Sequence, residues 1–468
     1  MIELGLQRIS RLLSKTHLPW RAIHVAGTNG KGSICVYISA MLEAYNKSAF
    51  RQQMDKPTIR HGRFTSPHLV DRWDCISIDQ KPVSSALFHE IESRVLLRNT
   101  AESINASEFE LLTATAFEIF THENVDIGVI EVGMGGRLDA TNILGKPVDT
   151  ETSSPSIIRA KPLVTALAKI GLDHQSFLGS TLQAIATEKA GILKPEIPLV
   201  YDASNPPEVL DTFKNMANDI EAPVPALADF DLPPSDLMSQ ALPPPILADI
   251  SPGLTKTDTS THLHTKQNTA VALHTTLLAL SQLSLIPLPP PASLLTNLLS
   301  VPSQTTFPGR LQNLNIQPLT GRNQSVLLDG AHNAQSAAVL AEATKRLRDS
   351  EDRQGQKPAI TWVLAASDSK DVKELLRPLL LPGDSIFAVE FGPVEGMPWV
   401  KAMASQRVLN YAHEVLGPGG AAEEGAFGPD VVAGLKGASE SARGGPLVIA
   451  GSLYLVGSVL RALREIEG

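Results

Sequence analysis

The chain has 468 residues, of which 43% are hydrophobic and 19% charged, and its net charge is −9. This length suffices for two or three domains with a substantial core. The acidic balance argues against nucleic-acid and membrane-surface proteins, whose binding faces carry clustered Lys and Arg, and no apolar run reaches the roughly 20 residues of a membrane span. With two cysteines, Cys35 and Cys75, we expect a reduced compartment rather than a disulfide framework.

Residues 1–15 combine apolar and basic side chains and include Glu3. A mitochondrial presequence would be rich in Arg and poor in acids. A glycine-rich loop follows as early as Gly27, which leaves little room for a removable leader. We therefore expect an ordered first helix and a cytoplasmic protein, with delivery to mitochondria through an uncleaved helix as the alternative.

Strand and helix patterns alternate through the first 304 residues, which indicates a parallel α/β sheet. In chain order we expect a strand at 21–27, a helix at 31–45, strands at 126–131 and 162–174, a helix at 181–193, a strand at 197–203 and a helix at 266–283. Two stretches interrupt this order. Residues 145–162 are polar and rich in Pro and Ser, as expected of a surface insertion, and residues 222–252 are rich in Pro and predict irregular structure.

A domain boundary is predicted near Thr305, between two Pro-containing segments. The alternation then restarts, which predicts a second, smaller α/β domain. Its expected elements are strands at 325–330, 359–367, 384–391 and 445–450 with helices at 334–349 and 452–463. Residues 417–430 are rich in Gly and predict a flexible loop.

The stretch HVAGTNGKGS, residues 24–33, resembles a phosphate-binding loop with unusual spacing. The common loop has a glycine, four residues, and then Gly-Lys-Ser/Thr. Here two residues separate Gly27 from Gly30, and Gly32 stands between Lys31 and Ser33. Glycines let backbone N–H groups close on phosphate, Lys31 can reach the β- and γ-phosphates, and Ser33 can reach magnesium. The alternative is a plain turn, which the strand-to-helix context disfavours.

Glu131 follows a fully apolar strand, where a lone carboxylate is costly to bury unless a cation accompanies it. A metal ligand and an ion-pair partner of Arg137 are both consistent with the spacing. Asp173 and His174 come at the predicted end of the next strand. A lone His is more often structural, but beside a phosphate loop and a strand-end acid we expect a metal ligand.

The remaining candidates are ambiguous when taken singly. Lys189 lies on a predicted helix, where an exposed, solvated lysine is the ordinary case. Ser66 and His68 flank a proline in FTSPHL, which is equally typical of a tight turn.

A second polar group falls near the domain boundary and the strand after it. FPGRL contains Arg310, and LLDGAHN contains Asp329, His332 and Asn333. The second group also fits an Asp-Gly turn followed by a helix-capping Asn.

Taken together and in this order, six motifs closely resemble the folylpolyglutamate synthetase and dihydrofolate synthase family, a branch of the Mur-type ligases. They are HVAGTNGKGS, FTSPHL, EVGMGGRLDATN, GLDHQSFLGSTLQAIATEKAGILKP, FPGRL and LDGAHN. The motifs run from the N-terminus to about Asn333. The resemblance is nearer to dihydrofolate synthases, because polyglutamate synthetases of eukaryotes tend to carry Lys at Asn29 and Gln-Lys-Gly-Gly where this chain has Glu-Lys-Ala-Gly at 188–191.

The resemblance implies an ATP-binding domain at 1–304, of the central Mur-ligase type with a P-loop parallel sheet, and a Rossmann-like ligase domain at 305–468. It implies ATP-dependent ligation of L-glutamate to dihydropteroate through an acyl phosphate, giving dihydrofolate, ADP and phosphate. Addition of glutamate to reduced folates, alone or as a second activity, is the alternative. The implied partners are these small molecules, with no nucleic acid and no membrane, and we expect a monomer that closes on binding its substrates.

Motif by motif, the resemblance also assigns residues. It implies Lys31, Lys189 and His332 as catalytic residues. The implied ATP-binding residues are Gly27, Thr28, Asn29, Gly30, Lys31, Gly32, Ser33, Asn268, Arg310 and Asp329. The implied ligands of two Mg²⁺ ions are Ser33, Ser66, Glu131, His174 and Lys189, the last as a carbamylated lysine.

The chain departs from the family pattern in three places. Thr265 replaces the Gln often found before Asn268, the insertion after Asn142 is long, and the DRWD segment leaves the pterin contacts undefined. Two rivals from other classes are a nucleotide-dependent switch or phosphotransferase, which would show no glutamate dependence, and a non-catalytic binding protein. Retention of Lys31, Glu131, His174 and Lys189 speaks against the second.

Overall fold

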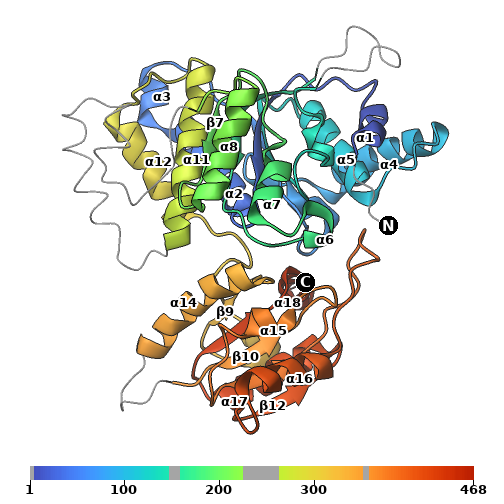
Figure 1. The fold of residues 1–468 in the computed structure, drawn as a ribbon, viewed down its shortest axis with the longest axis vertical. Coiled ribbons are helices and arrows are strands. Elements are labelled where there is room, and N and C mark those ends of the chain that lie inside the picture. The colour runs from blue at the N-terminus through green and yellow to red at the C-terminus, as the bar shows by residue number, and fades with distance from the viewer. Residues whose placement is uncertain (1–4, 147–158, 225–262, 351–357, 468) are drawn as a thin grey trace. The chain divides into compact units, whose positions relative to one another are not determined.

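The computed structural model describes residues 5–146, 159–224, 263–350 and 358–467 (Figure 1). The chain forms two compact units, the first of residues 1–68 and 73–305 and the second of residues 69–72 and 306–468. Both are α/β units built on largely parallel sheets, which confirms the predicted fold class. Most of the predicted insertion at 145–162 and of the Pro-rich segment at 222–252 lies outside the described residues.

The first unit contains a seven-stranded sheet in the order β4-β3-β2-β5-β1-β6-β7. Its strands are β1 (Arg21–Ala26), β2 (His61–Phe64), β3 (Ile76–Ile78), β4 (Lys81–Pro82), β5 (Ile127–Glu131), β6 (Lys161–Leu167) and β7 (Leu199–Tyr201). The strands from β2 to β7 in this order pair in parallel, and the β3–β4 hairpin adds antiparallel strands at one edge. The carboxyl ends of β1, β2, β5 and β6 therefore meet at one edge, where sheets of this kind bind ligands.

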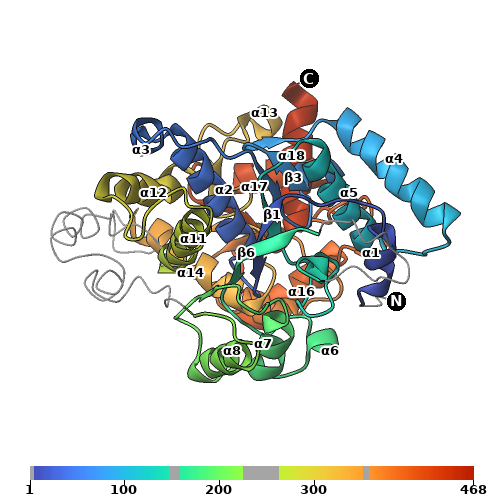
Figure 2. The same ribbon diagram turned by 90° about the horizontal axis from the view of Figure 1, so that it is seen from above.

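Helices cover both faces of this sheet (Figure 2). One core joins α2 (Lys31–Lys47), α11 (Leu263–Gln282) and α12 (Ala292–Gln304) to Ile23 and Val25 of β1. The opposite core joins α1 (Gln7–Leu12), α4 (Ser85–Ala101) and α5 (Glu108–His122) to Ala22 and to Phe64 of β2. The remaining helices are α3 (Ala49–Gln53), α6 (Gln175–Leu178), α7 (Leu182–Ala190) and α8 (Pro207–Asp219).

The helix predicted after the phosphate loop is α2, and its apolar spacing explains its position. Ile34, Ile38, Met41 and Tyr45 repeat at three- and four-residue intervals and are fully buried. This stripe packs on the apolar side chains of β1 and β5, so that the first turn of α2 stands at the carboxyl edge of the sheet.

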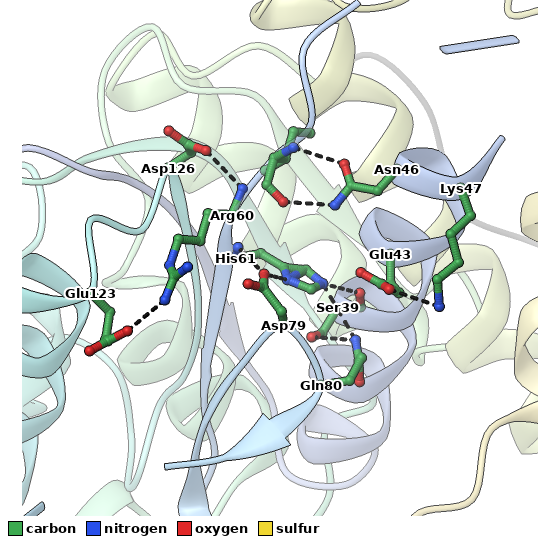
Figure 3. Close-up of polar contacts among 11 residues, drawn as sticks. Ser39, Glu43, Asn46, Lys47, Arg60, His61, Asp79, Gln80, Glu123 and Asp126 are labelled. Carbon is green, nitrogen blue, oxygen red and sulfur yellow. Dashed lines mark hydrogen bonds and ion pairs between the residues drawn. The ribbon is translucent and has the colours of Figure 1, made fainter. Parts of the chain in front are cut away.

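At the opposite, amino-terminal edge of the sheet, β2 begins with a buried and fully hydrogen-bonded histidine (Figure 3). His61 Nδ1 lies 3.0 Å from Asp79 Oδ1, and its Nε2 lies 2.7 Å from the carbonyl oxygen of Ser39 on α2. The preceding residue, Arg60, pairs with Glu123. These contacts tie β2 to α2 and to the β3–β4 turn, and they show that the His61 side chain faces α2.

The second unit has a six-stranded sheet in the order β12-β11-β10-β13-β9-β8, parallel except for β8. Its strands are β8 (Gln312–Leu314), β9 (Val326–Leu328), β10 (Thr361–Leu364), β11 (Ser385–Ala388), β12 (Glu424–Ala426) and β13 (Leu447–Ala450). Its helices are α13 (Gln317–Thr320), α14 (Ala334–Ser350), α15 (Val372–Leu376), α16 (Ser405–Leu416), α17 (Val431–Ala442) and α18 (Leu453–Glu467). The segment predicted as a Gly-rich loop at 417–430 contains β12, because the backbone of this short run completes the pairing of β11.

Residues 69–72 belong to the second unit although the chain around them belongs to the first. Arg461 on α18 donates a hydrogen bond of 2.6 Å to the carbonyl oxygen of Val70, and Arg464 pairs with Asp71. Gly457 allows the approach, since a Cβ there would lie 1.9 Å from the carbonyl oxygen of Leu69. The segment after the FTSPHL turn is therefore anchored on the last helix.

A buried ion pair stabilises the second unit. Arg348 on α14 donates two hydrogen bonds to Asp384, at 2.8 and 2.7 Å. The same carboxylate accepts hydrogen bonds from the Trp362 indole and from the backbone N–H groups of Ile360 and Leu381. Full satisfaction of both oxygens is what makes such a pair tolerable away from water.

Replacement of Asp384 by Asn should lower the free energy of unfolding by about 3–5 kcal/mol, because the Arg348 guanidinium then stays buried beside a neutral amide. Urea unfolding followed by circular dichroism measures this. Glu414→Gln is the matched control, since its pair with Lys373 is 51% and 42% exposed, and its loss should change stability by less than about 1 kcal/mol. Equal effects of the two variants would contradict the prediction.

Candidate active site

The loop between β1 and α2 closes through two close backbone approaches. Gly27 has φ +152°, and a Cβ there would lie 2.6 Å from that of Ala168. Gly30 has φ +90°, and its Cβ would lie 2.4 Å from Oδ1 of Asn268. The backbone N–H groups of Thr28 and Asn29 both donate to the carbonyl oxygen of Lys169, which holds the loop against the segment after β6.

Helix α2 begins at Lys31, and Gly30 provides no side-chain cap for its first N–H groups. These groups carry the positive end of the helix dipole, so the loop and the first turn form an anion-binding site. Lys31 folds along the loop and donates to the carbonyl oxygen of Thr28 at 3.2 Å.

Lys189 of α7 lies under this loop, buried to 4% exposure. Its Nζ donates to the carbonyl oxygen of Gly27 at 2.7 Å. The ordinary expectation of a solvated helix lysine is therefore wrong here. Burial and then the nearby charge of Lys31 lower the pKa of Lys189 to about 7, against the opposing effect of Asp173 and Asp139.

Glu131 ends β5 at the same edge and is 5% exposed. Its Oε2 accepts a hydrogen bond of 3.0 Å from the backbone N–H of Ser66, in the turn that follows β2. Arg137, the alternative partner of Glu131, pairs instead with Glu188 at 2.9 Å. The carboxylate is thus oriented by the FTSPHL turn.

Asn268 lies on α11, far from the loop in sequence. Its Oδ1 nonetheless faces Gly30, and the side chain is 8% exposed. The structure thus brings Gly27, Gly30, Lys31, Lys189 and Asn268 around one loop.

The strand preceding Asp173 and His174 was predicted too long. β6 ends at Leu167, and the backbone leaves the sheet there because Thr28 and Asn29 bond to the carbonyl of Lys169. His174 opens the short helix α6 with φ +51°, and its side chain is exposed. Asp173 accepts from the N–H of His174 and acts electrostatically on Lys189.

The rest of the EVGMGGRLDATN motif forms the scaffold of the site, a role that our sequence analysis missed. Asp139 is 3% exposed and accepts from the N–H of Met134 at 2.8 Å and from the N–H and hydroxyl of Thr141. Burial raises the pKa of this carboxyl against those hydrogen bonds. The Thr141 hydroxyl in turn lies 2.9 Å from His24 Nε2 on β1.

Asn142 continues this scaffold towards α7. Its amide donates to the carbonyl oxygens of Arg137 and Gly191, both at 3.0 Å, and its Oδ1 accepts from Lys194. Gly136 packs so closely on α7 that a Cβ would lie 2.6 Å from the carbonyl oxygen of Lys189. The motif therefore determines how closely α7, and with it Lys189, approaches the phosphate loop.

Polar groups of the second unit gather separately at the end of β9. Asp329 is 8% exposed and accepts from the backbone N–H groups of Leu311 and Ala331, both at 2.8 Å. Burial raises the pKa of Asp329, and the charge of Arg310 opposes this rise. His332 Nδ1 lies 2.8 Å from the carbonyl oxygen of Gly330. The predicted Arg310, Asp329 and His332 thus form one cluster.

The comparisons with known proteins agree with this geometry. A family profile described as "Dihydrofolate synthetase, C-terminal domain" matches residues 312–462. The "Probable dihydrofolate synthetase" of Schizosaccharomyces pombe is 35% identical over 422 residues, which cover 87% of each chain. The chain belongs to the dihydrofolate synthetase and folylpolyglutamate synthase family.

Other relatives of the family carry one or both of its names. The "Dihydrofolate synthetase" of Saccharomyces cerevisiae is 33% identical over 88% of this chain and 86% of that protein. The "Dihydrofolate synthase/folylpolyglutamate synthase" of Bacillus subtilis is 32% identical over 74% and 73%.

Solved structures of the family share the fold. E. coli FolC in complex with DHPP and ADP has a TM-score of 0.68 and 21% identity, covering 100% of this chain and 95% of that one. Mycobacterium tuberculosis folylpolyglutamate synthase complexed with ADP and AMPPCP has a TM-score of 0.69 and 23% identity, covering 98% and 95%.

The lowered pKa of Lys189 predicts a pH-dependent contribution to stability. In the folded protein Lys189 loses its proton near pH 7, while in the unfolded chain it keeps the proton until about pH 10.5. Between these values unfolding takes up a proton, so raising the pH stabilises the folded state. We expect the stability of the wild type relative to Lys189→Met to be lowest below pH 7 and to rise as the pH increases to about 9.

Urea unfolding of both proteins in bicarbonate-free buffer measures this difference. Other titrating groups, including Lys194, contribute equally to the two proteins and cancel. A difference that stays constant over this range would contradict the prediction.

Proposed function

We propose that this chain is an ATP-dependent ligase that joins L-glutamate to dihydropteroate and releases dihydrofolate, ADP and phosphate. The observation that carries the proposal is the uncapped phosphate loop with Lys189 and Asn268 gathered around it, in a chain whose similarity to dihydrofolate synthetases extends over most of its length. Polyglutamylation of reduced folates is the second candidate, because the Bacillus subtilis relative carries both names.

The carboxylate must first be activated. If the amine attacked it directly, the leaving group would be an oxide ion, which is too poor a leaving group for the reaction to proceed. An oxygen of the pteroate carboxylate attacks the γ-phosphorus of ATP, the bond to the bridging oxygen breaks, and ADP leaves with its electron pair. The glutamate amine then attacks the acyl carbon of the acyl phosphate, phosphate leaves, and the amine gives up its proton to the medium. Several anionic oxygens converge in both steps, so positioning and cationic groups supply most of the catalysis.

In this proposal the N–H groups of residues 30–33 and the ammonium of Lys31 bind the phosphates, Gly27, Thr28 and Asn29 shape the loop, and Asn268 contacts the nucleotide beside Gly30. Arg310, Asp329 and His332 of the second unit act on ATP, glutamate and the transferred phosphate. Gly27 and Gly30 support these roles, since a Cβ at Gly27 would collide with Ala168 and a Cβ at Gly30 with Asn268, and either collision would displace the loop.

The residues present fit magnesium. Mg²⁺ binds through one or two carboxylates together with substrate phosphates and water, and Glu131 is a buried carboxylate at the loop edge with hydroxyls of Ser33 and Ser66 in the adjoining loop and turn. We propose Glu131, Ser33 and Ser66 as the ligands of one ion. We propose that His174, at the start of α6, and the adjacent Asp173 contribute to the binding of a second. When bound, the metal neutralises phosphate charge.

Lys189 is suited to carbamylation, because its pKa of about 7 leaves much of the amine neutral at physiological pH. Reaction of the neutral amine with CO₂ forms an N–C bond and releases a proton. The buried ammonium then becomes a carboxylate that can serve as a metal ligand beside Gly27.

We expect a carbamate signal in the ¹³C NMR spectrum of the protein in ¹³C-bicarbonate at about pH 8, and its absence from Lys189→Met. Lys194→Met is the matched control, because Lys194 is also buried with a pKa near 7 but bonds to Asn142 and lies in the scaffold. A spectrum of the wild type without this signal would remove carbamylation from the proposal.

Among the described residues, no helix is both long and apolar enough to cross a membrane. We propose a monomeric enzyme of the cytoplasm or, like the relatives from Cricetulus griseus and Homo sapiens whose names include "mitochondrial", of mitochondria. Fractionation of cells with an antibody to the chain, together with light scattering of the purified protein, tests both statements.

Purified protein with Mg²⁺, ATP and dihydropteroate should release ADP only when L-glutamate is added. Lys31→Ala should lower this rate by at least ~100-fold, because a cation on the transferred phosphate is lost. A coupled ADP assay measures both. Glutamate-independent ADP release would point to a phosphotransferase or switch and contradict the proposal.

The acceptor decides between the two candidate functions. Dihydropteroate and a reduced folate are compared at equal concentration in the same assay, with products separated by mass. We expect a higher kcat/KM for dihydropteroate. A preference for the reduced folate would assign the chain to the polyglutamate synthases.

A further inference from the structure

Arg63 lies within β2 and directs its side chain towards the start of α2. Strand residues alternate between faces, and Gly62 and Phe64 face α5, since a Cβ at Gly62 would meet Phe120 and Phe64 stacks on Phe109 at 6.2 Å. His61 faces α2, as its contact with Ser39 shows (Figure 3). Arg63 therefore extends on the α2 side, two residues closer than His61 to the carboxyl edge of the sheet.

The charges that act on Arg63 place it at the phosphate loop. Burial lowers the pKa of Arg63, while Cys35 and then Glu131 act in the opposite direction. Cys35 belongs to the beginning of α2, and its own thiol is influenced by Glu131, Arg63 and Lys31. Arg63 pairs with Val129 of β5, whose side chain packs in the α2 core, and Glu131 lies two residues further along β5 on the same face. The guanidinium therefore lies near Glu131 and the beginning of α2, and it stays protonated at any physiological pH.

The Nε–H group of Arg63 has no acceptor in the part of the protein that the structure describes. The Nε atom itself is buried. Arg348, which is buried, makes two hydrogen bonds to Asp384, and Arg60, three residues before Arg63, pairs with Glu123. Arg63 as a whole is partly exposed, but a buried N–H group of a cation that lacks an acceptor costs free energy. The retention of Arg63 at an anion-binding loop is explained if a ligand supplies the missing acceptor.

An ion pair with Glu131 does not by itself explain why a cationic side chain occupies the position of Arg63. Burial lowers the pKa of Arg63 in spite of the nearby Glu131 carboxylate, and Glu131 Oε2 already accepts a hydrogen bond from the N–H of Ser66. If Arg63 served only as a counter-ion of Glu131, it would compete with the magnesium that we propose for this carboxylate.

We propose that Arg63 is a further catalytic residue, whose guanidinium binds the phosphoryl group as it passes from ATP to the pteroate carboxylate. This inference rests on the proposed function. In the step concerned, the carboxylate oxygen forms a bond to the γ-phosphorus while the bond to the bridging oxygen breaks and ADP departs. Negative charge on the three equatorial oxygens must be balanced throughout, and a planar guanidinium can donate two N–H groups to two of them.

The position of Arg63 favours the phosphoryl group over the other anions of the reaction. Lys31 and the first turn of α2 bind phosphate in our proposal, and Arg63 shares their surroundings. The phosphoryl group moves from ATP to the carboxylate during the step. A guanidinium suits such a group better than an ammonium, because its two parallel N–H groups can each stay hydrogen-bonded to a different phosphoryl oxygen.

The test compares Arg63→Met with the wild type in nucleotide binding and in catalysis. We expect affinity for a non-hydrolysable ATP analogue to fall about 10-fold while affinity for ADP changes less than about 2-fold, because only the analogue carries the γ-phosphate. Calorimetry measures both without turnover, so the result stands even if the proposed ligation fails. In the ADP-release assay kcat should fall by ~100-fold, and Arg63→Lys should recover part of it.

Stability and a matched variant separate this role from a structural one. Removal of a partly buried charge whose Nε has no protein acceptor should leave the urea midpoint of Arg63→Met unchanged or raise it. Arg60→Met removes an arginine of the same segment at the opposite edge of the sheet, where its side chain is 45% exposed, and should leave nucleotide affinity and kcat unchanged. Three results for Arg63→Met would each overturn the proposal. The first is an equal loss of affinity for ADP and for the ATP analogue. The others are a normal kcat together with a lowered urea midpoint, and a normal kcat together with activation at lower Mg²⁺ concentrations.

Discussion

The candidate active site depends on the contact between the Lys189 ammonium and the carbonyl oxygen of Gly27. This one hydrogen bond joins α7 to the loop that follows β1, across more than a hundred and fifty residues of sequence, and it does so with a group that prefers water. The contact requires that α7 lie close under the loop. Gly136 makes a close position of α7 feasible, because a Cβ there would lie 2.6 Å from the carbonyl oxygen of Lys189, and Gly27 lets the loop itself pack against Ala168.

The same constraint explains why so much of the EVGMGGRLDATN motif is devoted to structure. Asp139 and Asn142 form hydrogen bonds with their own loop, with Gly191 and with Lys194, and through Thr141 the loop reaches His24 on β1. Catalytic groups need positions that are reproducible to a fraction of an ångström, and buried, fully bonded polar groups supply that rigidity. Residues such as Asp139 therefore stabilise the segments that hold the phosphate loop, without being part of the loop.

Electrostatic design is local in this protein. The chain as a whole is acidic, with a net charge of −9, yet Lys31, Lys189 and Arg63 lie near the loop, together with the carboxylates of Glu131 and Asp173. Burial, and then the charge of Lys31, disfavours the charged form of Lys189, as its lowered pKa shows. In our proposal the anionic oxygens of a bound triphosphate favour the charged forms of these cations again.

Local sequence determined the elements and the order of the chemistry. The strand at 21–26, the helix from Lys31 and the strand ending at Glu131 follow from apolar periodicity and glycine placement, because those signals act over a few residues. The six motifs likewise indicated the family. The same signals missed β12 and made the strand before His174 too long, because the ends of these strands are set by pairing with β11 and by the loop at Lys169.

Tertiary structure alone decided the environment of each polar residue. Taken by itself, the sequence around Lys189 is that of an exposed lysine on a helix. Arg63 belongs to no recognisable motif. The one local signal for Arg63 is that a basic residue stands in a short strand next to FTSPHL. Burial, pairing of Arg137 with Glu188 and the approach of Asn268 to Gly30 are relations between segments distant in sequence. The burial that lowers the pKa of Lys189 and that leaves the Arg63 Nε without an acceptor arises only when those segments pack together. Neighbouring residues in the sequence therefore do not reveal it.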